Sequence, residues 1–328
     1  MKKIILYVGD DCSSSTSWHR AKAIERIGHT VIVLNPASFV GLRSKWRCRL
    51  DYITGYTLLQ SKLLYSFKRY AASLDFSVDL IWVNGGELIG PRLLCWLKSH
   101  FCCPAVLYNN DDPTGNRDGN RFLSLKRSLR YFDLCVMCRE ETAIEAAALG
   151  ALRGSRVMMS YDEHVHVRQA LFPLAGNESV SFVGTYIPGE YRDRQLLEMI
   201  HAGIPIFIAG NLWNKSSLFF DLKSALYGTA ITGTDYAKLI QTSAVSIGFL
   251  SHLNRDLVTR RTFEIPACGG LFCAERTSEH QLLFEDGIEA VFWDSVDECI
   301  PVCKELLADA ARNYSIRTAG HHHMLAAG

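Results

Sequence analysis

The sequence predicts an α/β fold made of two successive Rossmann-like domains, each built on a parallel sheet. Short apolar strands and helices alternate along the chain, which is typical of parallel sheets. The alternation is interrupted near residues 160–178, where Pro173, Gly176 and Asn177 stand, and then begins again. The length of 328 residues suits two domains of about 150 residues each. We therefore expect an N-terminal domain at 1–168 and a C-terminal domain at 169–328.

The N-terminal domain shows the alternation clearly. Strands are expected at residues 4–8, 31–34, 80–83, 105–108 and 134–137, with helices at 17–28 and 140–149. Serine and threonine residues precede the first helix and offer oxygens for its unpaired N–H groups. Most of these strands end in glycine or polar residues, so we expect ligands at the carboxyl ends of the strands.

The C-terminal domain repeats the pattern. Strands are expected at residues 180–183, 204–209, 244–249 and 271–274, with helices at 194–202 and 257–268. Gly269 and Gly270 follow the last of these helices and lead into an apolar strand. Glycine tolerates the left-handed backbone that helices commonly adopt at such an exit.

Composition excludes several classes of protein. The formal net charge is +1, which gives no reason to expect a nucleic-acid partner. There is no apolar run of roughly 18 residues, and the N-terminus turns acidic after a short strand instead of continuing as a signal core. These features predict a soluble cytoplasmic protein.

The eleven cysteines are scattered, without the spacing of a secreted disulfide scaffold. We interpret them as reduced, small core residues. Cys135 and Cys138 form a CxxC pattern within an expected strand, where alternation sends the two side chains to opposite faces. A redox or zinc site there is therefore disfavoured, and no metal site is predicted.

Residues 252–293 combine acidic, basic and glycine residues in one helix–strand unit. On a helix, Asp256, Arg260 and Glu264 are four residues apart, so their side chains share one face and can pair. Two interpretations stay open: an ion-paired helix surface, or a ligand site. In the second, Asn254 and Arg255 of the preceding loop add further polar groups.

This unit resembles the donor-binding half of GT-B glycosyltransferases, most closely the CgeB-like (spore-maturation) group. In retaining GT-B families a Glu-x7-Glu pair precedes Ala-x-Gly, and here Asp256 and Glu264 stand at its two positions. Further segments that resemble the group are 28–31 (Gly-His-Thr-Val), 111–113 (Asp-Asp-Pro) and 181–184 (Ser-Phe-Val-Gly). The resemblance weakens after Trp293, and His321 to Met324 stand where related chains carry a basic helix and His-Thr-Tyr.

The resemblance implies two facing Rossmann-like domains, with the nucleotide-sugar donor on the C-terminal one. It places Asp256 at the donor sugar and Glu264 at the ribose, whose two hydroxyls a carboxylate can accept together. Strand-end glycines and arginines are expected at the diphosphate, because a metal-independent enzyme must stabilise the leaving group with protein cations. The candidates are Gly184, Thr185, Tyr186, Arg192, Arg194 and Gly210. The alternative is a surface turn with solvated arginines.

The N-terminal domain is expected to bind the acceptor. Gly9, Asp10 and Asp11 follow the first strand, and Asp111 and Asp112 follow the fourth. An acceptor hydroxyl needs a general base or a polarising carboxylate, and any of these four acids or His19 can serve. The alternative is turn and cap chemistry, for which Asp-Pro is a common starter.

Basic and aromatic residues are concentrated in the N-terminal half. Such a belt can rest on anionic lipid head groups. A solvated helix face, or a site for a charged soluble acceptor, explains it equally well. The first group comprises Arg43, Lys45, Trp46, Arg47, Arg49, Lys62, Tyr65, Phe67, Lys68 and Arg69, and the second Arg121, Lys126, Arg127 and Arg130.

Together these features predict a metal-independent glycosyltransferase, retaining in outcome, without a cofactor, that uses a nucleotide diphosphate sugar. The acceptor would be a glycan, a lipid-linked molecule or a small molecule, as in bacterial cell-surface glycan biosynthesis. Two alternatives stay open. One is a nucleotide-sugar epimerase on the same fold, and the other is a catalytically silent nucleotide-binding module.

Overall fold

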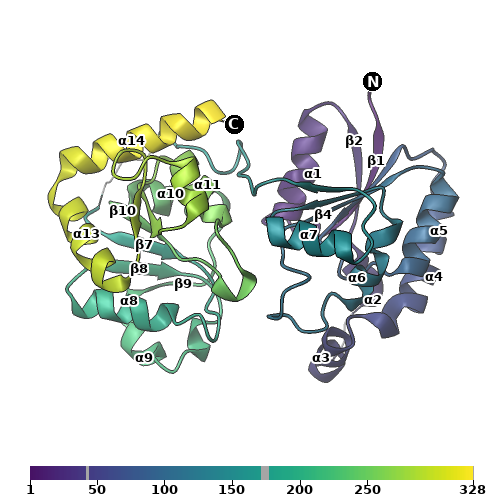
Figure 1. The fold of residues 1–328 in the computed structure, drawn as a ribbon, viewed down its shortest axis with the longest axis horizontal. Coiled ribbons are helices and arrows are strands. Elements are labelled where there is room, and N and C mark those ends of the chain that lie inside the picture. Colours follow the sequence, from purple (N-terminus) through teal and green to yellow (C-terminus); the bar gives the residue numbers. More distant parts are fainter. Residues whose placement is uncertain (42–43, 171–176, 328) are drawn as a thin grey trace. The chain divides into compact units, whose positions relative to one another are not determined.

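The computed structural model describes residues 1–41, 44–170 and 177–327, which form two compact α/β units (Figure 1). Unit 1 comprises Met1–Met158 with Leu253–Arg255, and unit 2 comprises Met159–His252 with Asp256–Gly328. The division falls between Met158 and Met159, whereas the sequence places it after residue 168. Pro173, Gly176 and Arg43 lie outside the described residues. The assignment of three late residues to unit 1 has no counterpart in the sequence pattern.

Unit 1 contains a six-stranded parallel sheet in the order β2-β1-β3-β4-β5-β6. Its strands are β1 (Ile4–Val8), β2 (Thr30–Leu34), β3 (Leu80–Asn84), β4 (Ala105–Asn109), β5 (Leu134–Met137) and β6 (Gly154–Arg156). Its helices are α1 (Thr16–Arg26), α2 (Pro36–Val40), α3 (Lys45–Ile53), α4 (Gln60–Ala71), α5 (Pro91–Phe101), α6 (Leu123–Ser128) and α7 (Glu140–Ala148).

Both faces of the unit 1 sheet are covered, as expected for parallel strands. Leu6 and Val8 of β1 lie in an apolar cluster with residues of α4, α5 and α6. Ile5 and Tyr7 point to the other face and pack against α1. Successive side chains of β1 point to opposite faces of the sheet. Because β1 is an inner strand and both faces are covered, every residue from Ile5 to Val8 is buried.

Unit 2 contains a second six-stranded parallel sheet, in the order β12-β11-β10-β7-β8-β9. Its strands are β7 (Val180–Val183), β8 (Ile206–Ala209), β9 (Leu226–Gly228), β10 (Val245–Gly248), β11 (Phe272–Glu275) and β12 (Val291–Trp293). Its helices are α8 (Arg192–His201), α9 (Phe219–Leu222), α10 (Gly233–Thr242), α11 (Arg260–Ala267), α12 (Ser278–Leu283), α13 (Val296–Ala308) and α14 (Ala310–Ala327).

Each sheet has one position where successive crossovers run in opposite directions. In unit 1 the strand order reverses between β1 and β3, and in unit 2 between β7 and β10. The loops that leave the carboxyl ends of two such strands diverge and leave a crevice, which is where open α/β sheets bind ligands. The topology therefore marks one candidate region in each unit.

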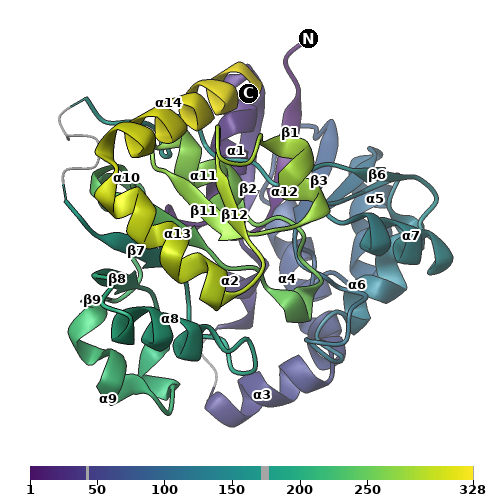
Figure 2. The same ribbon diagram turned by 60° about the vertical axis from the view of Figure 1, so that its left-hand side comes forward.

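Helix α14 closes unit 2 by packing against α11 and α13 (Figure 2). Its buried Arg317 donates to the backbone oxygens of Gln241, Ser243 and Ala244 at distances of 3.0, 2.6 and 3.2 Å. Asn313 Nδ2 donates to the Ala244 oxygen as well, at 2.9 Å. These bonds satisfy carbonyl groups between the end of α10 and the start of β10. Among the helices that the structure describes, none has the length and apolar character that a membrane crossing requires.

Candidate functional site

A pocket of about 440 Å³ opens at the carboxyl ends of β1, β3 and β4 in unit 1. It lies at the position where the strand order reverses, and its walls come from the loops that follow these strands and from the start of α1. Its polar lining residues include Asp10, Ser15, Thr16, Asn35, Asn84, Glu87, Asn110, Asp111 and Arg121. Carboxylates outnumber guanidinium groups in this lining.

Arg121 is the cation of this pocket, and nearby acids already engage it. Its Nε donates to Glu87 Oε2 at 2.5 Å, and its terminal nitrogens lie 3.3 Å from Asp118 Oδ2 and 3.7 Å from Asp111 Oδ2. These negative charges raise the pKa of Arg121 although burial lowers it. Burial raises the pKa of Glu87, although Arg121 opposes this effect. The pocket therefore offers hydrogen-bond acceptors rather than a free positive charge.

The structure separates the predicted acceptor-side residues into two groups. Gly9, Asp10 and Asp111 belong to the described residues that line the pocket, and Asp11 and His19 do not. Asp11 Oδ1 instead accepts a hydrogen bond from Asn35 Nδ2 at 2.7 Å. His19 lies on α1, and its Nε2 is 3.1 Å from the backbone oxygen of Ser13.

Asp112 lies outside the lining and holds an arginine. It is 2% exposed, and its two carboxylate oxygens accept from Nε and one terminal nitrogen of Arg255, both at 2.7 Å. Thr142 Oγ1 donates to the same carboxylate at 3.1 Å. Although burial raises it, the Arg255 guanidinium holds the pKa of Asp112 below its usual value. Arg255 also binds Glu145 Oε2 at 2.8 Å. Arg255 was predicted in the donor site of the C-terminal domain, but it belongs to unit 1. The same holds for Asn254.

Glu264 lies in a buried charged cluster of unit 2. Its side chain is 2% exposed, one carboxylate oxygen accepts a hydrogen bond from Arg261, and the other lies 3.5 Å from His166 Nε2. The Arg261 guanidinium also lies 4.7 Å from the centre of the Tyr236 ring. Burial alone would raise the pKa of Glu264, but Arg261, Arg260 and His166 outweigh it and lower the pKa to about 2. The carboxylate is charged and already paired.

The predicted face of Asp256, Arg260 and Glu264 does not form. Helix α11 begins at Arg260, and Asp256 lies before it, where its N–H donates to the Ser251 oxygen at 3.3 Å. The reason is local, because Thr259 and Thr262 form a capping box in which the Thr259 N–H donates to Thr262 Oγ1 at 3.1 Å. The helix pairs Glu264 with Arg261, three residues away, rather than with Arg260.

The glycine exit of α11 is confirmed. Gly269 has a φ of 77°, the left-handed conformation that glycine adopts without steric cost. The Gly270 N–H donates to the Ile265 oxygen at 3.0 Å, and the Gly269 N–H donates to the Pro266 oxygen at 2.9 Å. This pair of bonds is a Schellman motif and satisfies carbonyl groups at the helix end.

The turns after β7 and β8 lie close together. A Cβ atom on Gly210 would stand 2.0 Å from the Gly184 oxygen, so only glycine fits there. The Gly184 oxygen accepts a hydrogen bond from Trp213 Nε1 at 2.9 Å. Thr185 is exposed beside them, and the Tyr186 ring packs 5.8 Å from the Trp213 ring. Four predicted donor-side positions are therefore neighbours at this edge of the sheet.

Arg261 reaches the same edge from α11. Its Nε donates to the Val183 oxygen, at the end of β7, at 3.0 Å. Among the described residues, no hydrogen bond or ion pair engages the side chain of Arg260, the first residue of α11. A helix N-terminus has unpaired N–H groups and a partial positive charge. The carboxyl end of β7 therefore contacts Arg261, and Arg260 precedes this residue as the first residue of α11.

The predicted phosphate-binding Arg192 is largely buried, and its terminal nitrogen donates to the Leu250 oxygen at 2.5 Å. This contact holds the loop that follows β10. Arg194 is exposed, and its guanidinium lies 5.1 Å from the centre of the Tyr191 ring. The buried Arg192 therefore differs from the solvated arginines of the alternative interpretation, whereas the exposed Arg194 agrees with it.

A histidine that no sequence pattern indicated lies between two acids of unit 2. His252 follows β10, and its ring nitrogens lie 3.2 Å from Glu190 Oε2 and 2.6 Å from Glu275 Oε2. Hydrogen bonds to Glu190 and then to Glu275 raise the pKa of His252 to about 10. The three residues lie more than twenty positions apart from one another, so no short motif could reveal them. The available signals were Glu190 and His252, in the loops after β7 and β10, and Glu275 at the end of β11; these three strands are neighbours in the sheet.

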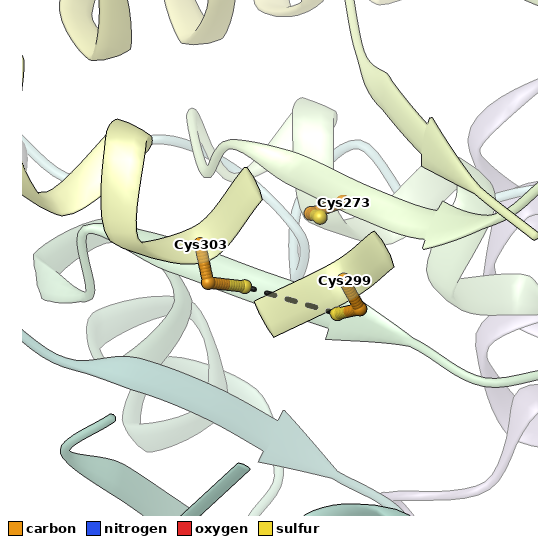
Figure 3. A group of neighbouring side chains, drawn as sticks. All are labelled: Cys273, Cys299 and Cys303. Carbon is orange, nitrogen blue, oxygen red and sulfur yellow. Dashed lines mark hydrogen bonds between the residues drawn. The ribbon is translucent and has the colours of Figure 1, made fainter. Parts of the chain in front are cut away.

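Three cysteines of unit 2 lie close together. Cys299 and Cys303 share one side of α13 with their sulfur atoms 3.8 Å apart, and Cys273 lies nearby on β11 (Figure 3). All three sulfur atoms lie within 4.8 Å of one another. A structural zinc site needs four ligands, and the described residues add no fourth histidine, cysteine or acid to this group. The thiols belong to the apolar cluster of unit 2 and are interpreted as packing residues.

The other cysteines divide by exposure. All eleven are free thiols. Cys12, Cys48, Cys95 and Cys102 are exposed, which corrects the expectation that the cysteines are core residues. They lie in surface loops and on outward helix faces. In the CxxC pattern both sulfur atoms are buried, and burial raises the pKa of Cys135 to about 12.

Known proteins with a similar sequence segment or a similar fold include glycosyltransferases. Residues 192–327 match a family described as glycosyl transferase-like. Anabaena HepE in complex with UDP and glucose is 13% identical, with a TM-score of 0.66 over 98% of this chain and 94% of that chain. Sucrose-phosphate synthase from Thermosynechococcus elongatus is 12% identical, with a TM-score of 0.70 over 99% of this chain and 94% of that chain. No curated protein matches the sequence.

A third structure, a glycosyltransferase from Rickettsia africae, is 12% identical, with a TM-score of 0.61 over 99% of this chain and 94% of that chain. The two six-stranded parallel sheets and these likenesses define the GT-B fold, as the sequence predicts. Residues 192–327, which match the glycosyl transferase-like family, belong to unit 2. The predicted enzyme class, glycosyltransferase, is thereby confirmed.

Proposed function

We propose that this protein transfers a sugar from a nucleotide diphosphate sugar bound by unit 2 to an acceptor bound by unit 1. The match of residues 192–327 to a glycosyl transferase-like domain is the observation that carries the proposal. Those residues include α8, β10 and α11, which surround the position where the strand order of unit 2 reverses. HepE, which has the same fold, binds UDP-glucose, and a uridine diphosphate donor is therefore the first candidate.

The donor diphosphate is proposed to lie at the carboxyl end of β7. The turn at Gly184 lets a ligand approach the backbone, and the N-terminus of α11 supplies N–H groups. Arg260 has no ion-pair partner among the described residues and can meet the phosphate charge. Such preorganised cations stabilise a leaving diphosphate without a bound metal.

Buried residues around this edge are proposed to position the donor-binding groups. Glu264 holds the guanidinium of Arg261 beside the Val183 oxygen. Its proposed role at the ribose is therefore indirect, by positioning Arg261. Arg192 fixes the loop after β10 through the Leu250 oxygen. Asp256 remains the candidate for the donor sugar on the basis of the sequence resemblance.

The acceptor is proposed to bind in the 440 Å³ pocket of unit 1. Asp10 and Asp111 line it, and Asp111 is the proposed group that polarises the acceptor hydroxyl. Its side chain is 37% exposed, whereas Asp112 is occupied by Arg255. Carboxylates accept hydrogen bonds from hydroxyl groups and repel anions. The acceptor end that enters this pocket is therefore a neutral, hydroxyl-bearing group.

Several finer parts of the proposal rest on the sequence resemblance. They are the CgeB-like grouping, retention of anomeric configuration, independence of metal and a role in bacterial cell-surface glycan synthesis. The proposed location is the cytoplasm, with peripheral contact at the inner face of the membrane through the basic N-terminal half. A glycan or lipid-linked acceptor fits such a location.

A thermal-shift screen with UDP, GDP, dTDP, ADP and CMP sugars tests the donor proposal. We expect one nucleotide class to raise the melting temperature, because a ligand that binds only the folded state stabilises it. Calorimetry then gives its affinity. If none of the five binds, the donor site is absent and the proposal fails.

Product analysis with the binding nucleotide sugar separates the remaining functions. Transfer to an added acceptor supports the glycosyltransferase. Conversion of the nucleotide sugar without an acceptor identifies an epimerase. Binding without turnover for any acceptor offered supports the silent module. Mass spectrometry of the reaction mixture distinguishes transfer from the other two outcomes, and NMR of the recovered nucleotide sugar distinguishes epimerisation from no reaction.

A further inference from the structure

Helix α3 of unit 1 is exposed along almost its whole length. Every residue from Lys45 to Leu50 is exposed, followed by the buried Asp51 and the exposed Tyr52 and Ile53. Figures 1 and 2 both show α3 at the periphery of unit 1, apart from its sheet. A helix in this position does not contribute to the core, so its exposed side chains need another explanation.

The apolar side chains of α3 form one stripe. Trp46, Leu50 and Ile53 are 63%, 42% and 52% exposed. They occupy positions i, i+4 and i+7, which at about 100° per residue fall within one narrow sector of the helix. Asp51 lies on the far side, toward the body of the unit. The stripe therefore points outward, and Leu58, which is 63% exposed, continues the apolar surface beyond the helix.

Cations flank the stripe on both sides. On the helical wheel Lys45 and Arg49 lie on one side and Arg47 on the other, and all three are exposed. The Arg47 guanidinium lies 5.2 Å from the centre of the Trp46 ring. The only acid of the helix, Asp51, is 3% exposed. The outward surface of α3 is thus apolar at its centre and positive at its edges.

The helix is fixed at its carboxyl end. Tyr52 Oη donates to Asp118 Oδ1 at 2.9 Å, and the Tyr56 N–H donates to the Asp51 oxygen at 2.8 Å. Gly55 follows with a φ of 58°, and a Cβ atom there would stand 2.3 Å from the Asn120 oxygen. This tight turn holds α3 in a set orientation, so the outward stripe is presented rather than free to fold back.

We infer that α3 is an interfacial helix that inserts Trp46, Leu50 and Ile53 into the head-group layer of an anionic membrane. An apolar stripe between cations is the pattern of helices that lie in the plane of such a surface. Each cation gains from the negative surface potential. A second copy of the chain fits less well, because a two-fold contact would bring these cations against one another. The inference rests on the membrane contact proposed above and names its element.

Vesicle sedimentation tests this inference on the full chain. Vesicles of phosphatidylcholine alone are compared with vesicles that contain about one-third phosphatidylglycerol. We expect binding only to the anionic vesicles, weakened by added salt. The double variant Trp46→Ala, Leu50→Ser should bind at least roughly tenfold more weakly, since two apolar side chains are lost. The double variant Arg47→Gln, Arg49→Gln should lose about fivefold per cation.

Matched controls change apolar and basic residues elsewhere that are also exposed. Leu152 and Phe220 are 76% and 82% exposed, and the pair Leu152→Ser, Phe220→Ala should leave vesicle binding unchanged. The pair Arg92→Gln, Arg153→Gln is the control for charge.

Absence of wild-type binding to anionic vesicles overturns the inference, as does equal binding by the stripe variant. Self-association that the stripe variant abolishes, without vesicle binding, would assign α3 to a second copy instead. Nucleotide binding by calorimetry is independent of these outcomes, so failure of the donor proposal is recognised separately.

Discussion

The two units place charged residues at the same edge of similar sheets and use them differently. In unit 1, Asp10 and Asp111 line an open pocket of about 440 Å³. In unit 2, Glu264 is 1% exposed and lies against Arg261 and His166. A carboxylate in the first position is available to a ligand, whereas one in the second is already committed to protein groups. An acid near the carboxyl edge of a sheet, whether it follows a strand as Asp111 does or lies on a helix as Glu264 does, therefore does not reveal its own role there.

The largest effect expected from this comparison is that of Glu264→Ala. Removing the carboxylate leaves Arg261 and His166 without their buried partner, which typically costs about 3–5 kcal/mol. For a domain of this size the melting temperature of unit 2 should fall by roughly 10 °C. Differential scanning calorimetry measures it. The exposed Glu198→Ala on α8 is the control and should melt like the wild type. An unchanged Glu264→Ala melting temperature, with lost nucleotide affinity, would make Glu264 a direct ribose ligand.

Adjacent acids of unit 1 should respond in opposite ways. Asp112→Asn weakens a buried bidentate pair with Arg255 and should lower stability by about 2–3 kcal/mol. Asp111→Asn should leave stability unchanged and lower transfer by a hundredfold or more, within the range typical of lost general-base catalysis. Urea unfolding and initial rates measure the two effects. If both variants are stable and inactive, Asp112 acts in the reaction as well.

Arg260 is expected to contribute to donor affinity without contributing to the fold. Arg260→Gln should weaken UDP binding by roughly tenfold, within the range for a charge-assisted hydrogen bond. The melting temperature should not change. Arg194→Gln on the nearby α8 is the matched control, since its guanidinium packs on the Tyr191 ring. Equal affinity losses in both variants would indicate a diffuse charge effect instead of a contact at the start of α11.

The smallest effect on stability is expected from His252, and it depends on pH. The pKa of His252 is raised from 6.5 to about 10 by Glu190 and Glu275. The stabilisation is therefore complete below pH 6.5 and is lost as the pH rises through about 10. Because the His252 side chain is 57% exposed, the contribution stays below about 1 kcal/mol. Melting temperatures of wild type and His252→Gln should converge above that pH. Parallel curves would show that His252 is not charged.

The pH response of Glu264 has the opposite direction. Its pKa is lowered from 4.5 to about 2, so its stabilisation is present above pH 4.5 and is lost as the pH falls toward 2. Acid unfolding of wild type and Glu264→Gln should therefore differ at neutral pH and converge in strong acid. Circular dichroism between pH 2 and pH 7 follows this convergence, and a constant difference across the range would contradict it.

Much of the fold could be predicted from the sequence. The strands β5 and β7 begin and end at the expected residues, because buried parallel strands are continuous apolar runs bounded by polar residues. The edge strands β6, β9 and β12 have three residues each and are too short to show a period. The start of α11 was predicted three residues early, because the capping box at Thr259 and Thr262 competes with the apolar pattern.

The site was predicted less completely, for a physical reason. Gly9, Asp10 and Asp111 are local features of strand ends, and they do line the pocket. The pairing of Asp112 with Arg255 joins residues 143 positions apart. The cluster of Glu190, His252 and Glu275 depends on the order of the strands in the sheet. Such long-range partners decide whether a charged side chain is paired within the protein or available to a ligand. Local patterns in a single sequence do not show which residues become these partners.

The contacts of Arg317 have a consequence for the order in which unit 2 is completed. Arg317 and Asn313 bind carbonyl groups at 241, 243 and 244, immediately before the inner strand β10. The bonds span about 70 residues of sequence. During synthesis, the segment that leads into β10 therefore emerges from the ribosome long before its hydrogen-bond partners. Unit 2 cannot reach its final packing until residue 317 has been made, although unit 1 except for Leu253–Arg255 is finished far earlier.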